Sequence, residues 1–170
     1  MWVRRVAAEV IHFAADQGIA RSEALWLKCP HCGEPNIRMS DGRMYPPSIG
    51  VSLVNGLPPD VENAWRDART DHATAAYTAS EMMCRKILMH LAVNVAKSPA
   101  GLPFVQYVQD LEDKGYILPG LRTRVDAIRD RGNAANRELP ASTEPQSCET
   151  LQVTEFLLKG AYELGAGATP

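Results

Sequence analysis

The feature that most constrains this fold is the spacing of apolar residues after Leu57, which recur every three or four positions. This is the period of an amphipathic α-helix. It is clearest at Phe104, Tyr107, Val108 and Leu111, which stand at i, i+3, i+4 and i+7. The same spacing predicts helices over residues 61–70, 73–96, 104–115, 121–137 and 146–163. Aromatic residues make up only 6% of the chain, which favours helices packed on helices over a β-sandwich. The prediction is a mainly α bundle of about five helices.

The first third of the chain has a different character. Residues 2–16 have the apolar spacing of a helix, and Gly18 marks the expected C-terminal end of that helix. Residues 25–54 contain Cys29-Pro30-His31-Cys32-Gly33 and two short candidate strands, at 36–39 and 49–54. The sequence therefore predicts an N-terminal helix within 1–24, a small knuckle-like or β-rich segment within 25–56 and a helical domain within 57–165.

Composition limits the classes of protein that the chain can belong to. No apolar run is long enough to span a bilayer, and Glu9, His12 and Asp16 interrupt any signal-peptide core. Four cysteines without a regular framework are typical of a reducing compartment. These features predict a soluble, cytoplasmic protein. The net charge of −2 excludes a wholly basic nucleic-acid binder and still permits a local basic patch.

Cys29 and Cys32 have the spacing of one half of a zinc knuckle. A structural zinc site needs four ligands, and no second CxxC or HxxxH follows. His31, His12 or a second subunit could contribute, but the ligand set within the chain is incomplete. We therefore favour a degenerate knuckle whose tight turn persists without metal, and we expect no cofactor. A redox CxxC is disfavoured because no βαβ pattern surrounds it.

Positive charge is concentrated in the segment from Arg122 to Arg137. This segment contains five arginines and two aspartates. The rest of the chain then has 13 basic and 18 acidic residues, so this stretch is basic against an acidic background. Two interpretations remain open. One is a solvated helix with internal Arg–Asp pairs, which spacing alone favours. The other is an anion site, because arginine forks suit phosphates. The residues of such a nucleic-acid-binding site would be Arg122, Arg129, Arg131, Asn133 and Arg137.

The opposite side of the same helix is apolar. Leu121, Val125, Ile128, Gly132 and Ala135 recur at helical spacing and predict a face that packs on the core. Glycine weakens a helix by about 1 kcal/mol relative to alanine. On a buried face, however, it allows another helix to approach closely.

Four short motifs in order resemble a family of domains of unknown function, the one numbered 4145, which is grouped with HEPN-like all-α domains. The resemblance covers roughly residues 26–163. The motifs are Leu57-Pro58-Pro59-Asp60-Val61 before Ala64-Trp65, then Ala76…Ala79…Arg85-Lys86, then Phe104…Tyr107-Val108…Leu111, and finally Ile128-Arg129…Gly132-Asn133…Ala135-Asn136.

The resemblance implies a HEPN-like helical bundle. HEPN ribonucleases use an arginine and a histidine on one helix, commonly across a dimer interface, so Arg129, Asn133 and Arg137 correspond to the catalytic positions. The family has histidine where this chain has Arg137. Arginine stays protonated and cannot carry a proton as histidine does. The implied protein is a catalytically weakened or inactive HEPN-like homodimer, which binds RNA, nucleotide phosphate or a protein partner through the Arg122–Arg137 helix.

Two alternatives stay open. The first is an active metal-independent endoribonuclease that uses Arg129 and an unrecognised base. The second is a protein-interaction module without nucleic acid. Among the histidines, His90 falls within the apolar stripe of helix 73–96, and we expect it to be a core residue. Family analogy alone suggests phage defence or a toxin–antitoxin pair as the cellular context.

Overall fold

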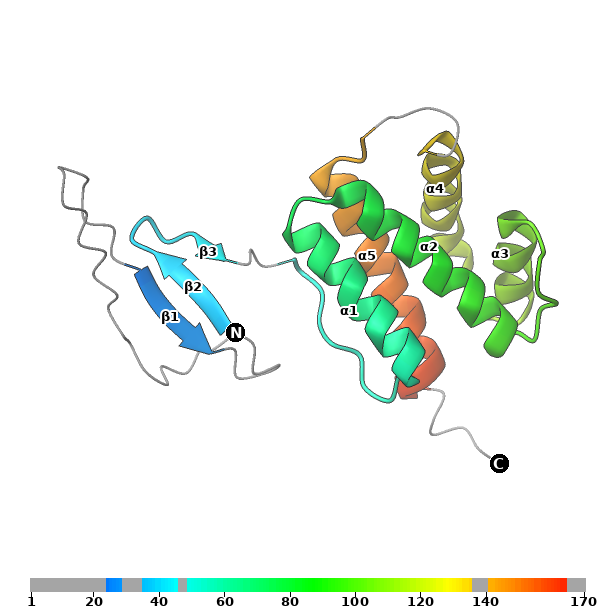
Figure 1. Cartoon of the computed structure of the whole chain (residues 1–170). Coiled ribbons are helices and arrows are strands. Elements are labelled where there is room, and N and C mark those ends of the chain that lie inside the picture. The colour runs from blue at the N-terminus through cyan, green and yellow to red at the C-terminus, as the bar shows by residue number, and fades with distance from the viewer. Residues whose placement is uncertain (1–23, 29–34, 46–48, 136–140, 165–170) are drawn as a thin grey trace. The chain divides into compact units, whose positions relative to one another are not determined.

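The computed structural model describes residues 24–28, 35–45, 49–135 and 141–164 (Figure 1). The chain divides into two compact units, residues 1–48 and 49–170. The described part of the first unit is a small sheet, and the second is built from helices. The prediction of a mainly α fold with a small β segment is confirmed. The helix expected over residues 2–16 lies outside the described residues.

The first unit contains a three-stranded antiparallel sheet in the order β1-β2-β3. The strands are β1 (Ala24–Lys28), β2 (Pro35–Met39) and β3 (Met44–Tyr45). Gly42, with φ of 87°, lies in the tight turn between β2 and β3, where its N–H donates to the Met39 carbonyl at 2.9 Å. The expected strand at 36–39 is confirmed as β2.

The prediction of a strand at residues 49–54 is wrong. These residues form no strand; Val54 is buried and Val51 packs against the same helical core. A Glu155 carboxylate oxygen accepts hydrogen bonds from the backbone N–H of Ser52 at 3.0 Å and from its hydroxyl at 2.5 Å. Residues 49–54 therefore place their apolar side chains against the helices instead of pairing in a sheet.

The second unit contains the five expected helices. They are α1 (Pro59–Ala73), α2 (Tyr77–Asn94), α3 (Phe104–Asp113), α4 (Pro119–Ala135) and α5 (Glu144–Leu158), followed by a π-helical turn, η1 (Lys159–Leu164). Pro58 is the N-cap of α1, and Asp60 lies in the first turn of that helix. The expected start at residue 73 is also wrong, because α2 begins at Tyr77 after a turn in which Ala75 has φ of 63°.

Helix α2 lies at the centre of the helical unit. One hydrophobic cluster joins it to α3, α4 and α5, and a second joins it to α1 and α5 (Figure 1). Trp65, Leu88, Leu91, Leu111 and Leu151 are almost completely buried in these clusters. On α4, Val125, Ile128 and Gly132 are buried, which confirms the predicted packing face. This packing fixes the position of the arginines on the rest of α4.

None of the helices in the described ranges combines the length and the apolar character that a membrane span requires.

Candidate anion-binding site

The α4 arginines are held by ion pairs and hydrogen bonds to several helices, and Arg122 and Arg129 share Asp126 as a partner. Arg122 pairs with Glu112 of α3 and with Asp126 one turn along α4, where Nε and Oδ2 are 3.2 Å apart. It also donates to the Gln109 side chain at 3.3 Å. These contacts join α3 to α4 and favour the ion-pair interpretation for Arg122.

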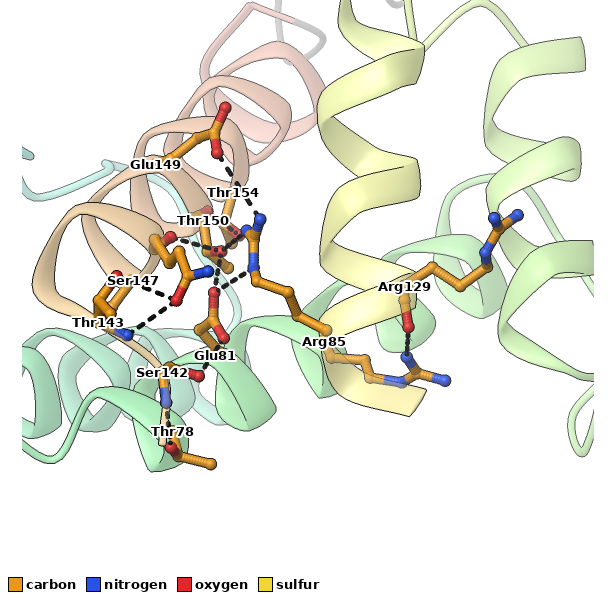
Figure 2. A network of polar contacts seen from close by, with 12 residues as sticks. Thr78, Glu81, Arg85, Arg129, Ser142, Thr143, Ser147, Glu149, Thr150 and Thr154 are labelled. Atoms are coloured by element: carbon orange, nitrogen blue, oxygen red, sulfur yellow. Dashed lines mark hydrogen bonds and ion pairs between the residues drawn. The ribbon is translucent and has the colours of Figure 1, made fainter. Parts of the chain in front are cut away.

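Arg131 points into the interior between α2 and α5. Its Nε lies 2.8 Å from Oε1 of Glu81, and its Nη2 donates to the Thr150 hydroxyl at 2.8 Å. Ser142 donates to the other oxygen of Glu81, and Figure 2 shows this carboxylate enclosed by Ser142 and Thr150. Only 8% of the Glu81 side chain and 19% of the Arg131 side chain are exposed. Arg131 is therefore a structural cross-link and is poorly placed to meet a nucleic acid.

Arg129 lies closer to the surface, with 28% of its side chain exposed. Its Nη1 is 3.0 Å from Asp126, and its Nη2 is 2.9 Å from Asp130. The internal Arg–Asp pairs expected from the spacing of these residues are therefore present. Asn133, one turn further along, makes its contact with α2 instead.

The partner of Asn133 is Arg85 of α2, which was not among the site residues expected from the sequence. Arg85 Nη2 donates to Oδ1 of Asn133 at 3.1 Å, and Nη1 donates to the backbone carbonyl of Arg129, also at 3.1 Å. The guanidinium carbon lies 4.2 Å from the centre of the Phe104 ring. Figure 2 shows the Arg129 side chain extending away from the contact that its carbonyl makes with Arg85.

Gly132 makes room for the Arg85 side chain. A Cβ atom at this position would lie 2.5 Å from Nη1 of Arg85 and 3.1 Å from its Cδ. The group that approaches Gly132 closely is therefore the side chain of Arg85, not the backbone of another helix.

Arg85, Arg129, Gly132 and Asn133 form a cluster where α2 meets α4, called here the α2–α4 cluster. The charge of Arg85 is its unusual property. Within residues 24–28, 35–45, 49–135 and 141–164, no carboxylate pairs with it. Burial of the guanidinium, followed by repulsion from Arg129, lowers the pKa of Arg85. Two arginines thus lie close together where α2 meets α4, and one of them has neutral partners only. The guanidinium of Arg85 should attract an anion, because a counter-charge stabilises a half-buried charge more than a fully solvated one.

The histidines are placed differently from expectation. His90 is not a core residue: 41% of its side chain is exposed, and its Nε2 lies 3.2 Å from Asp60. The buried histidine is His72, whose Nδ1 is 2.8 Å from the Ser147 hydroxyl. Burial lowers the pKa of His72, against an opposing influence of Glu144. These contacts of His72 and His90 involve neither Arg129 nor Asn133.

Several predicted site residues fall outside the described part of the chain, namely Arg137, Cys29 and Cys32. Among the residues that are described, no three Asp, Glu, His or Cys side chains are grouped to share a metal ion. Cys84 is buried in α2, and burial raises the pKa of its thiol to about 12. It would stay protonated at neutral pH, unlike a zinc-binding thiolate.

A comparison of the chain with protein-family models, curated proteins and solved structures gives no match.

Proposed function

We propose that this chain is a HEPN-like protein that binds the phosphate backbone of RNA where α2 meets α4, with little or no cleavage activity. The observation that supports this most is Arg85, a half-buried guanidinium with neutral partners among the described residues and with Arg129 close by. The family resemblance supplies RNA as the source of the phosphate.

The chemistry of the cluster suits a phosphodiester. A guanidinium presents several N–H donors in a planar fork, and two of those on Arg85 are used by Arg129 and Asn133. The remaining donors can meet phosphate oxygens. Because Oδ1 of Asn133 already accepts from Arg85, the amide nitrogen of Asn133 is left as a further donor toward an anion. A phosphate bound to Arg85 would lie near Arg129, whose guanidinium would exchange Asp126 or Asp130 for a phosphate oxygen.

Weak or absent cleavage follows if neither Arg137 nor a histidine among the described residues can carry the proton. Arg137 stands where the family has histidine, and arginine does not release its proton in the neutral range. His72 is enclosed by Ser147 and Tyr77, and His90 lies beside Asp60. General base catalysis requires a group within hydrogen-bond reach of the attacking hydroxyl.

The test is binding of a fluorescently labelled single-stranded RNA, followed by anisotropy at low and moderate salt. We compare Arg85→Gln with Lys86→Gln, which removes the same charge from the next, exposed residue of α2. Losing a charge-assisted contact to phosphate should weaken binding about tenfold in Arg85→Gln. Arg129→Gln should also weaken binding, and Lys86→Gln should have a small effect.

Equal losses in Arg85→Gln and Lys86→Gln would contradict a specific site and indicate diffuse electrostatic binding. The same samples, analysed by gel, report on catalysis. RNA products with 2′,3′-cyclic phosphate ends that disappear in Arg129→Ala would establish the ribonuclease alternative. A mass measurement in solution on each variant keeps changes in assembly separate from changes in binding.

A further inference from the structure

One residue from each strand of the N-terminal sheet forms a row across a single face. Trp26 of β1 lies opposite Ile37 of β2, and Ile37 lies opposite Tyr45 of β3. Residues directly opposite one another in neighbouring strands project from the same face. Trp26 is 41% exposed and Tyr45 is 45% exposed, so the row presents two aromatic rings to solvent.

Basic residues accompany these rings. Lys28 is two positions after Trp26 on β1, which places it on the same face, and it is exposed. The guanidinium carbon of Arg43 lies 6.0 Å from the centre of the Tyr45 ring, and its Nη1 donates to the Tyr45 hydroxyl at 3.2 Å. These contacts hold a cation beside the aromatic surface.

Basic side chains outnumber acidic ones on the Trp26–Ile37–Tyr45 face. The charged side chains that the structure describes on or beside this face are Lys28, Arg43 and Asp41, whereas Arg38 lies opposite Leu25 and Met44 and projects from the other face. Asp41 is paired with Arg43, with Oδ2 and Nε 2.6 Å apart. A polyanion is therefore the partner whose charge complements this face.

The geometry points to a single-stranded nucleic acid, and we propose that the Trp26–Ile37–Tyr45 face binds single-stranded RNA by base stacking. Adjacent strands are about 4.8 Å apart, so the two rings are separated by about 10 Å, with the smaller Ile37 between them. Each ring can receive one unstacked base, while Lys28 and Arg43 meet phosphates. A protein partner would also use aromatic anchors, but the flanking cations favour a strand that carries negative charge along its length.

This proposal is independent of the Arg85 site, because it concerns the other unit and other residues. The two sites also differ in what they recognise. Stacking requires bases, whereas the proposed contacts of Arg85 require phosphates only. An oligonucleotide that keeps the sugar–phosphate backbone but lacks bases therefore distinguishes them.

The experiment measures binding of the full chain to labelled oligouridylate and to an abasic strand of the same length. Trp26→Ala and Tyr45→Ala should each weaken oligouridylate binding about tenfold, because stacking one base on an aromatic ring contributes on that scale. Neither change should alter binding of the abasic strand. Trp26→Phe keeps a ring and should retain most of the affinity. Leu25→Ala, on the opposite face of β1, is the matched control.

Repeating the series in Arg85→Gln separates this proposal from the proposed function. Base-dependent binding that survives Arg85→Gln and is lost on adding Trp26→Ala supports the stacking face, whatever happens at α2 and α4. Unchanged oligouridylate binding in both Trp26→Ala and Tyr45→Ala would overturn the proposal. A lower solution mass of Trp26→Ala would also overturn it, because the face would then bind a second copy of the chain. A loss of oligouridylate affinity in Leu25→Ala equal to that in Trp26→Ala would overturn it as well.

Discussion

At the scale of single residues, the α2–α4 cluster depends on which side chains are missing as much as on which are present. Arg85 reaches Arg129 and Asn133 because Gly132 has no side chain in its path. Arg85 is held on its other side by the Phe104 ring. A single added carbon atom at Gly132 should therefore disturb the guanidinium.

Gly132→Ala tests this directly. Alanine gains about 1 kcal/mol over glycine in a helix, while forcing extra atoms into a packed contact costs about 1–3 kcal/mol. Because the new Cβ would lie 2.5 Å from Nη1 of Arg85, we expect the cost to exceed the gain. The free energy of unfolding should fall by about 1 kcal/mol, measured by urea unfolding.

Gly120→Ala is the matched control, since it lies on the same helix with no atom near its added Cβ. It should leave stability unchanged or raise it by up to about 1 kcal/mol. If Gly132→Ala stabilised the protein as much as Gly120→Ala, Arg85 would be free to move aside, and the tight contact would have no energetic consequence.

At the scale of elements, α2, α4 and α5 are joined by a buried ion pair as well as by apolar packing. Glu81 of α2 meets Arg131 of α4, and Thr150 of α5 donates to Glu81 at 2.9 Å (Figure 2). The partners are 50 residues apart in sequence. The Glu81 carboxylate is buried and accepts from Arg131, Ser142 and Thr150. Without the positive charge of Arg131, burying this negative charge would destabilise the fold.

We expect Arg131→Met to be strongly destabilising, because it leaves Glu81 buried without a cation. Removing one partner of a buried pair costs about 3–5 kcal/mol, whereas an exposed pair contributes less than about 1 kcal/mol. The control is Arg124→Met: Arg124 is 56% exposed and lies 3.8 Å from Glu149. Urea unfolding followed by circular dichroism measures both. A loss in Arg131→Met no larger than that in Arg124→Met would show that water reaches Glu81.

At the scale of the whole molecule, the two units have separate sources of stability. Both hydrophobic clusters draw their residues from the second unit, from Val51 to Tyr162. The described part of the first unit is a sheet of short strands with two exposed aromatic rings. The helical unit should therefore not require the sheet in order to fold.

A chain of residues 49–170 should be helical and should unfold cooperatively. We expect its melting temperature to differ from that of the full chain by less than about 5 °C, which corresponds to about 1 kcal/mol. Circular dichroism during heating is the measurement. Broad, non-cooperative melting would mean that residues 1–48 contribute to the core of the helical unit.

Much of the fold could be predicted because its signals are local. Helical periodicity located α3 and the packing face of α4, and the short candidate strand at 36–39 is β2. The wrong expectations concern residues whose surroundings depend on tertiary packing. Residues 49–54 alternate like a strand but dock on helices. His90 falls within the apolar stripe of the sequence, yet 41% of its side chain is exposed and it lies beside Asp60.

The helices, the concentration of arginine on α4 and the inward-facing glycine follow from local sequence patterns. The role of each arginine depends on how the helices pack. Arg131 and Arg129 are two positions apart on α4, yet one pairs with a buried glutamate of α2 and the other with aspartates of its own helix. Arg85, absent from the expected site, joined it across 48 residues. The physical reason is that helix formation depends on neighbours along the chain, whereas the partner of a charge depends on which helices pack together.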